Sequence, residues 1–216
     1  LLSEIQTIDF QSITELFNSL KETPKETKKP EFSPMPCCYI EDQPSKGIEK
    51  WKKLGQESLD KGELAILLMA GGQGSRLGLE GPKGAFVPHG LEEELSLFGH
   101  QAKSLTSKVK ADQTPPLWLI MTSPLNQKQT QEHFDANDYF GYPQDRIYFF
   151  NQGTIPAIDT QGKILLSSKS EIALVPDGNG GCFRALQKTG LDKVLDENGI
   201  KQLFIYGVDN LLIKLP

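Results

Sequence analysis

Four short, mainly apolar runs mark the hydrophobic pattern of the second part of this chain. They cover residues 65–69, 117–121, 146–150 and 203–206. A short unbroken apolar run is typical of a strand that is buried on both faces of a sheet. Amphipathic segments lie between these runs, and strands that alternate with helices favour parallel pairing. We therefore expect an α/β fold with a mostly parallel sheet flanked by helices.

The segments between and after these strands carry the spacing and end signals of helices. Helices are expected over residues 96–108, 124–135, 181–186 and 191–197. One stretch departs from the alternation of strands and helices. Residues 155–158 and 163–166 flank the sequence DTQG at 159–162, a pattern that predicts a β-hairpin.

The N-terminal region has a different character. Residues 1–20 predict one amphipathic helix, because apolar positions from Ile13 to Leu20 follow an i, i+3, i+4, i+7 spacing and Asp9 suits the N-cap. Residues 21–36 are charged and rich in proline, which indicates an extended linker.

A second surface helix is expected over residues 46–61, with Gly62 as its C-terminal stop. The change in composition after it divides the chain into a helical and extended segment, 1–62, and a sheet-containing segment, 63–216. The chain begins without methionine and ends directly after an apolar run. We therefore expect it to be a piece of a longer protein.

Composition and charge exclude several classes of function. The formal net charge is −5, which argues against a nucleic-acid binder, because such proteins need a basic face. No apolar run approaches the roughly 18 residues that a membrane-spanning helix requires, so we expect no membrane partner. Three cysteines provide neither a disulfide framework nor a zinc-binding spacing, which favours reduced thiols in a cytoplasmic protein.

The most informative segment is the loop that directly follows the first apolar run. It spans residues 70–83 and contains five glycines together with Arg76 and Lys83. Ligands of open α/β sheets bind at the carboxyl ends of the strands. Glycines allow backbone N–H groups to approach phosphate oxygens, and the two cations can bind phosphate directly. The segment therefore predicts a loop that binds a nucleotide phosphate.

Its residues do not match two common phosphate loops. The Rossmann fingerprint needs a third glycine where Leu77 stands. The Walker loop needs Gly-Lys-Ser/Thr, which occurs nowhere in the chain, and Pro82 precedes Lys83. A dinucleotide-binding oxidoreductase is also disfavoured by Leu77 and by the lack of an acidic residue at the end of a second strand. The loop therefore belongs to a third type.

The sequence GGQGSRLG at residues 71–78, followed by Pro82 and Lys83, resembles the signature loop of the sugar-phosphate nucleotidylyltransferases. More narrowly, it resembles the UDP-N-acetylhexosamine pyrophosphorylases and related UDP-sugar pyrophosphorylases. Further motifs follow in family order: NQG at 151–153, PDGNGG at 176–181 and VDN at 208–210.

This resemblance implies a Rossmann-like nucleotidyltransferase fold of the GT-A-like type and a Mg²⁺-dependent reaction. Such enzymes join UTP to a sugar 1-phosphate and release pyrophosphate. In that reading, residues 63–216 are the UTP-binding part of the nucleotidyltransferase domain. The family continues well beyond Asp209, so we expect the domain to be truncated at the C-terminus.

The resemblance also assigns roles to single residues. Arg76 and Lys83 would be catalytic and would stabilise charge on the pyrophosphate side. Asn179 would contact the ribose or the sugar, and Asp209, a carboxylate at a strand end beside the triphosphate, would bind Mg²⁺. The carboxamide of Gln152 offers a donor and an acceptor together, which suits the uracil edge. The residues expected to bind UTP are Met69, Ala70, Gly71, Gly72, Gly74, Lys83, Gln152 and Gly178.

Three functions remain as alternatives at this point. The preferred one is a uridylyltransferase that uses N-acetylglucosamine 1-phosphate. The second is a UTP–glucose-1-phosphate uridylyltransferase, and the third is a nucleotide-binding module without catalysis. The sequence leaves the sugar and the oligomeric state open.

Overall fold

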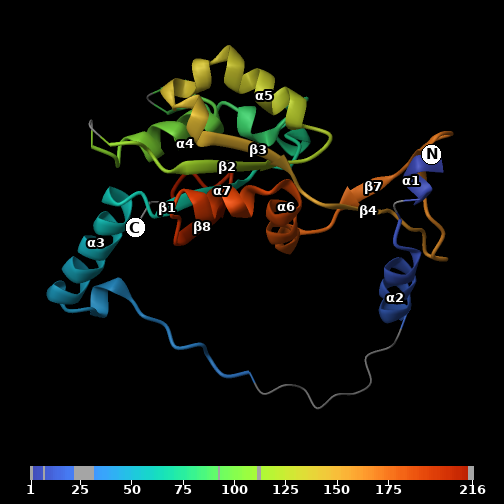
Figure 1. Cartoon of the computed structure of the whole chain (residues 1–216), viewed down its shortest axis with the longest axis horizontal. Coiled ribbons are helices and arrows are strands. Elements are labelled where there is room, and N and C mark those ends of the chain that lie inside the picture. The colour runs from blue at the N-terminus through green and yellow to red at the C-terminus, as the bar shows by residue number, and fades with distance from the viewer. Residues whose placement is uncertain (1, 7, 22–31, 92, 111–112, 214–216) are drawn as a thin grey trace. The chain divides into compact units, whose positions relative to one another are not determined.

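The computed structural model describes residues 2–6, 8–21, 32–91, 93–110 and 113–213, and the chain divides into two compact units (Figure 1). The smaller unit combines Leu1–Gln43 with Thr154–Pro176. The larger unit combines Pro44–Gly153 with Asp177–Pro216. This division differs from the sequence-based boundary after residue 62, because helix α3 (Ser45–Asp60) belongs to the larger unit and Thr154–Pro176 to the smaller one.

The larger unit is built on a four-stranded sheet in the order β3-β2-β1-β8. All of its neighbouring strands are parallel, as the sequence predicts. The strands are β1 (Leu64–Met69), β2 (Leu117–Thr122), β3 (Ile147–Asn151) and β8 (Gln202–Gly207). Each includes most or all of one predicted apolar run.

Helices cover both faces of this sheet (Figure 1). The helices are α4 (Leu97–Thr106), α5 (Gln127–Ala136), α6 (Cys182–Thr189) and α7 (Leu191–Glu197), all within predicted helical segments or within a few residues of them. Strand β1 supplies both cores, because its side chains alternate between faces. Leu64, Ile66 and Leu68 pack with α4 and α5, whereas Ala65 and Leu67 pack with α6 and α7.

Short 3₁₀ helices complete the regular structure. They are η1 (Ile40–Asp42), η2 (Ser75–Leu77), η3 (Lys83–Ala85), η4 (Asp138–Gly141), η5 (Gln144–Arg146) and η6 (Asn179–Gly181). Helix α3 ends as predicted before Gly62, which has a left-handed φ of 67°. Among the described residues, no helix is long and apolar enough to cross a membrane.

In the smaller unit, the amphipathic helix predicted within residues 1–20 with Asp9 as its cap is confirmed as α2 (Phe10–Lys21). A separate short helix before it, α1 (Leu2–Gln6), was not predicted. Asp9 caps α2 as predicted: its carboxylate accepts hydrogen bonds from the Ser12 amide at 3.0 Å and the Ser12 hydroxyl at 2.6 Å. A helix restarts at this cap, so the chain is not one continuous helix. Residues 22–31 of the predicted linker lie outside the described residues.

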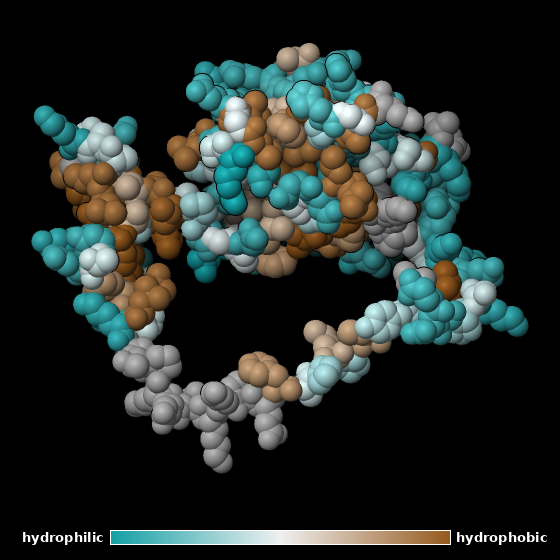
Figure 2. Space-filling model, turned by 180° about the vertical axis from the view of Figure 1, so that it is seen from behind, coloured by the Kyte–Doolittle hydropathy of each residue, from teal (hydrophilic) through white to brown (hydrophobic). Residues whose placement is uncertain are grey.

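The predicted hairpin is confirmed near its turn, where the Gly162 amide donates to the Asp159 carbonyl at 3.0 Å and an antiparallel bridge joins Ile158 to Ile164. On either side of that bridge, the Asp159 amide donates to the Lys163 carbonyl and the Leu165 amide to the Ala157 carbonyl, both at 2.8 Å. The regular antiparallel pairs are β4 (Thr154–Pro156) with β7 (Leu174–Pro176) and β5 (Leu166–Ser168) with β6 (Glu171–Ile172). Exposed apolar side chains gather on this unit (Figure 2). They include Phe10, Leu16, Leu20, Leu165, Leu166, Leu174 and Val175.

Candidate nucleotide site

The candidate site lies where the carboxyl ends of the parallel strands meet. Backbone bonds continue past the strands there and hold the following segments side by side. The Ala70 amide donates to the Met121 carbonyl at 2.7 Å, and the Val208 amide donates to the Met69 carbonyl at 3.1 Å. The Gln152 amide donates to the Thr122 carbonyl at 2.8 Å. The segments after β1, β3 and β8 therefore share one edge of the sheet, as the topology requires.

The glycine-rich loop after β1 folds back on itself. The Gly74 amide donates to the Gly81 carbonyl at 2.8 Å, and the Lys83 amide donates to the Gly72 carbonyl at 3.0 Å. Gly74 is buried, and a Cβ there would lie 2.9 Å from Cβ of Leu79, so the turn requires glycine. The return brings Lys83 beside Gly72, although ten residues separate them in the sequence.

Three consecutive amides of this loop are available to a ligand. Among the described residues, no group accepts a hydrogen bond from the amides of Gly71, Gly72 or Gln73. Buried backbone donors in a folded protein are normally paired, whereas these lie at the edge where α/β proteins bind ligands. Successive free amides of this kind form a site for phosphate or carbonyl oxygens.

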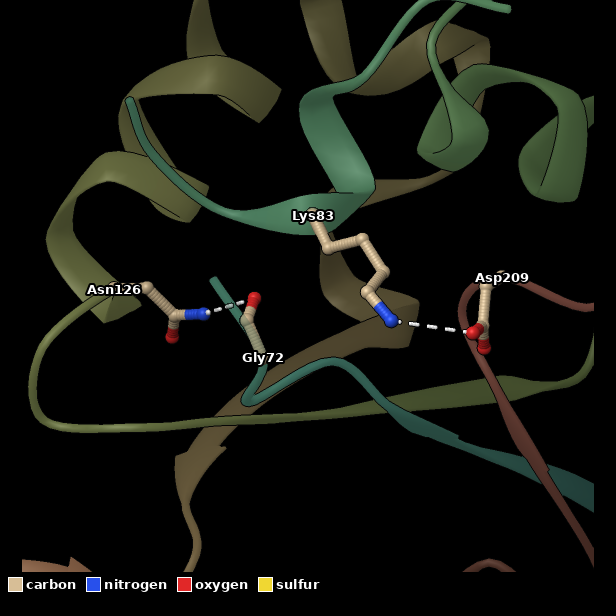
Figure 3. Close-up of polar contacts among 4 residues, drawn as sticks. All are labelled: Gly72, Lys83, Asn126 and Asp209. Carbon is tan, nitrogen blue, oxygen red and sulfur yellow. Dashed lines mark hydrogen bonds and ion pairs between the residues drawn. The ribbon is translucent and has the colours of Figure 1, made fainter. Parts of the chain in front are cut away.

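Lys83 and Asp209 form an ion pair at this edge (Figure 3). Nζ of Lys83 lies 3.2 Å from Oδ2 of Asp209. The hydrogen bond from Lys83 lowers the pKa of the Asp209 carboxyl below its ordinary value of 3.8, and the charge of Arg76 acts in the same direction. Asp209 is therefore ionised at neutral pH. Arg76 is exposed on η2, within the loop that follows β1.

Gln152 packs directly on the glycine-rich loop. A Cβ on Gly71 would lie 2.8 Å from Oε1 and 2.9 Å from Nε2 of Gln152, too close for any residue but glycine unless Gln152 moves. The backbone amide of Gln152 is bonded to the end of β2, and its carboxamide lies against Gly71. The structure thus brings together two residues that are far apart in the sequence.

Gly178 and Asn179 lie in a second glycine-rich turn and are exposed. Gly178 has a φ of 90°, which favours glycine. The turn is attached near Gln152, because the Asp177 amide donates to the Gly153 carbonyl at 3.1 Å. In the described part of the chain, no hydrogen bond joins Asn179 to Lys83, Arg76 or Asp209.

Two buried carboxamides that the sequence analysis did not single out support the site. Asn126 donates to the carbonyls of Ala70 and Gly72. Gln101 on α4 donates to the Asn210 carbonyl at 3.2 Å and accepts from the Tyr206 hydroxyl at 2.9 Å. Two sequence features could have drawn attention to them. Asn126 is a polar residue shortly after the second predicted strand, and Gln101 is a glutamine inside a predicted helix.

Asp209 is an exposed carboxylate at this edge. Among the described residues, no group of three or more His, Cys, Asp or Glu side chains could hold a metal ion. Asp209 is ionised, and its side chain is 64% exposed. A single accessible carboxylate suits Mg²⁺, which takes most of its ligands from phosphates and water when it accompanies a nucleotide.

The chain is similar to several known proteins. The family model of UTP--glucose-1-phosphate uridylyltransferase matches residues 9–214. UDP-N-acetylglucosamine pyrophosphorylase of Saccharomyces cerevisiae is 41% identical over 207 residues, which cover 93% of this chain and 42% of that protein. UDP-N-acetylglucosamine diphosphorylase 2 of Arabidopsis thaliana is 35% identical, with coverage of 100% and 45%.

A solved structure is similar as well. The uridine diphosphate N-acetylglucosamine pyrophosphorylase of Trypanosoma brucei, crystallised with an inhibitor, matches 78% of this chain and 36% of its own with a TM-score of 0.73 and 33% identity. This chain therefore spans less than half the length of the relatives that it matches. Because the family model covers nearly all of its residues, the chain belongs to the UTP--glucose-1-phosphate uridylyltransferase family.

Proposed function

We propose that this protein is a uridylyltransferase that joins UTP to N-acetylglucosamine 1-phosphate and releases pyrophosphate, and that this chain supplies its UTP-binding part. The observation that carries the proposal is the Lys83–Asp209 pair beside the free amides of the glycine-rich loop. All proposed UTP-binding residues fall within the predicted segment 63–216. The relatives at 35–41% identity are named for N-acetylglucosamine, which favours that sugar over glucose.

In the proposed reaction, a phosphate oxygen of the sugar attacks the α-phosphorus of UTP. A new P–O bond forms to the sugar phosphate while the bond to the β-phosphate oxygen breaks, and pyrophosphate leaves. No protein nucleophile is needed, so catalysis consists of positioning and charge stabilisation. Lys83 and Arg76 would stabilise the growing charge on the phosphates. Gln152 and the amides of Gly71 to Gln73 would bind the uridine part and the phosphates, and Asn179 the ribose or the sugar.

Asp209 is the residue that would hold Mg²⁺, with phosphate oxygens as further ligands. When bound, the ion supplies positive charge that offsets the charge of the triphosphate. Asp209→Asn keeps the shape of the side chain but removes its charge. We expect the affinity of the variant for UTP to depend less on Mg²⁺, while uridine, which has no phosphate, binds as it does to the wild type.

A cytoplasmic location belongs to the same proposal. All three cysteines have free thiols. Cys37 and Cys38 are neighbours in the sequence, and both are exposed. Exposed unpaired thiols are typical of a reducing compartment. We include neither nucleic acid nor membrane among the partners, in keeping with the acidic net charge of −5.

Pyrophosphate release tests the proposal. The full-length protein that carries this sequence is incubated with UTP, Mg²⁺ and a panel of sugar 1-phosphates. The expected result is fastest release with N-acetylglucosamine 1-phosphate. A preference for glucose 1-phosphate would support the alternative substrate. UTP binding without release for any sugar would support a binding module instead.

A further inference from the structure

Asn126 lies beneath the glycine-rich loop, and its side-chain carboxamide is fully hydrogen-bonded. It is fully buried. Its Nδ2 donates to the Ala70 carbonyl at 3.0 Å and to the Gly72 carbonyl at 3.2 Å, the second of which is drawn in Figure 3. Its Oδ1 accepts from the Ser123 amide at 2.8 Å and from the Ser123 hydroxyl at 3.0 Å. A carboxamide has two donor hydrogens and two acceptor positions, and all four are used here.

These bonds set the direction of the loop amides. In a planar trans peptide, the carbonyl and the following N–H point in opposite directions. A bond from Asn126 to the Ala70 carbonyl therefore directs the Gly71 amide away from the protein interior. The bond to the Gly72 carbonyl does the same for the Gln73 amide. Both amides are among the three that find no acceptor within the described residues.

The two carbonyls depend on Asn126 to different degrees. The Gly72 carbonyl also accepts from the Lys83 amide at 3.0 Å. The Ala70 carbonyl has no second donor among the described residues. Glycines at 71 and 72 add no side-chain restriction of their own, since glycine populates several backbone conformations. Asn126 is thus the main restraint on the Gly71 peptide.

We propose that Asn126 is a positioning residue for nucleotide binding: it holds the peptides of the glycine-rich loop so that the Gly71 and Gln73 amides face the ligand. The proposal rests on the proposed function for the identity of that ligand, UTP. Asn126 acts through the loop rather than by contact with the nucleotide. The role requires two N–H donors on one planar group. Alanine has no side-chain donor, and serine has one.

A matched control separates this role from a general contribution to stability. Tyr142 is also buried, and its hydroxyl donates to the Pro116 carbonyl at 2.6 Å just before the start of β2, at the opposite edge of the sheet. Tyr142→Phe removes one buried hydrogen bond without touching the loop. The variant therefore measures how far the loss of one buried hydrogen bond lowers the melting temperature when the glycine-rich loop is unchanged.

The experiment compares Asn126→Ala, Asn126→Ser and Tyr142→Phe in the full chain. Three quantities are measured: the melting temperature, the amide resonances of the glycine-rich loop in ¹H–¹⁵N spectra, and the affinity for UTP. In Asn126→Ala we expect the Gly71 resonance to shift or broaden most and that of Gln73 less. We expect UTP affinity to fall about tenfold or more, in line with the loss of aligned donors. Asn126→Ser should lie between this variant and the wild type, and it serves in place of Asn126→Ala if that variant does not fold.

Tyr142→Phe should lower the melting temperature but leave the Gly71 resonance and UTP affinity unchanged. The proposal is overturned if the Asn126 variants leave the Gly71 and Gln73 resonances where they are, or if they change them no more than Tyr142→Phe does. A wild-type chain that does not bind UTP would refute the proposed function. The loop resonances would then still decide whether Asn126 positions the amides.

Discussion

Two glycine-rich loops at the same edge of the sheet are held in different ways. In the loop after β1, Asn126 donates to the carbonyls of Ala70 and Gly72. The Lys83 amide also donates to the Gly72 carbonyl, and Gly74 is buried. The turn before α6 exposes Gly178, Asn179 and Gly180, and it is closed by two local backbone bonds, from the Gly181 amide to the Gly178 carbonyl at 3.0 Å and from the Cys182 amide to the Asn179 carbonyl. Glycine content alone therefore does not tell how rigid a loop is.

The difference suggests separate tasks for the two loops. A loop whose amides are fixed before the ligand arrives loses little conformational entropy on binding. We therefore expect the first loop to supply affinity for the nucleotide. The exposed turn has few restraints, so its residues contribute mainly when a ligand is present. Changes in the first loop should affect the free protein, whereas changes in the second should not.

The largest effect is expected from Lys83→Ala. It removes the cation of the first loop that pairs with Asp209, where phosphate charge would develop in the proposed reaction. The loss of such a contact costs on the order of 3 kcal/mol, or about 10²-fold in turnover. Pyrophosphate release by the full-length protein measures it. Lys103→Ala is the control, because Lys103 pairs with Glu93 on the surface and should leave turnover near normal. If the two variants released pyrophosphate at equal rates, Lys83 would not be a catalytic residue.

Gly71→Ala should have the next largest effect. The new Cβ would lie 2.8 Å from the Gln152 carboxamide, so either Gln152 or the loop has to move. Because the contacted atoms are the end of a flexible side chain, we expect Gln152 to move at little cost in stability. Its carboxamide would then leave the proposed uracil contact, and we expect UTP affinity to fall roughly tenfold. Calorimetric titration measures it.

Gly47→Ala in α3 is the matched control, because its nearest atom to the new Cβ is 3.8 Å away. It should bind UTP normally and be at least as stable as the wild type, since alanine favours helix formation. If Gly71→Ala also bound UTP normally, the contact between Gln152 and the first loop would have no role in binding.

Asn179→Ala tests the exposed turn and should have a smaller effect. One hydrogen bond to a ligand contributes about 1 kcal/mol, or roughly fivefold in affinity. We expect weaker binding of UDP-N-acetylglucosamine with an unchanged melting temperature of the free protein. Calorimetry and thermal unfolding measure the two quantities. A melting temperature several degrees lower would show that the turn is as firmly held as the first loop.

The smallest effect concerns the pH dependence of stability. The folded-state pKa of Asp209 is lowered by Lys83, so its stabilising contribution is present above the ordinary pKa of 3.8 and is lost as pH falls below it. Because the pair is largely exposed to solvent, the contribution is below about 1 kcal/mol. Denaturant unfolding of the wild type and Asp209→Asn should show a small gap at pH 6 that closes towards pH 3. A gap that widens in acid would contradict the assignment.

The sequence predicted the strands well because continuous apolar runs are a local signal of burial on both faces. Ser96 was likewise a correct helix start, since its hydroxyl accepts from the Gly99 amide at 3.2 Å. The pairing of β4 was not predictable in the same way. Its partner β7 is more than fifteen residues further along the chain, and both strands are three residues long, so the nearby turn at 159–162 gave the stronger signal.

The site was predicted only in part for a related reason. The residues of the first loop, Gln152 and Asp209 follow strands, and strand ends of a parallel sheet meet at one edge. Asn126 and Gln101 act through contacts with residues 54 and 109 positions away, and nothing in their own neighbourhoods reveals those contacts. The ligand-facing residues implied by the family resemblance stay predictions, whereas the residues that hold the first loop became visible only in the fold.

Nucleotide selectivity tests the central claim most directly, which is that the first loop with Gln152 forms a preorganised uridine nucleotide site. Calorimetric titrations compare UTP and ATP on the wild-type chain in the presence of Mg²⁺, with the loop amides followed in parallel. The predicted result is tighter binding of UTP, accompanied by shifts of the Gly71 and Gln73 resonances. Equal or tighter binding of ATP, or UTP binding that leaves these amides unchanged, would contradict it.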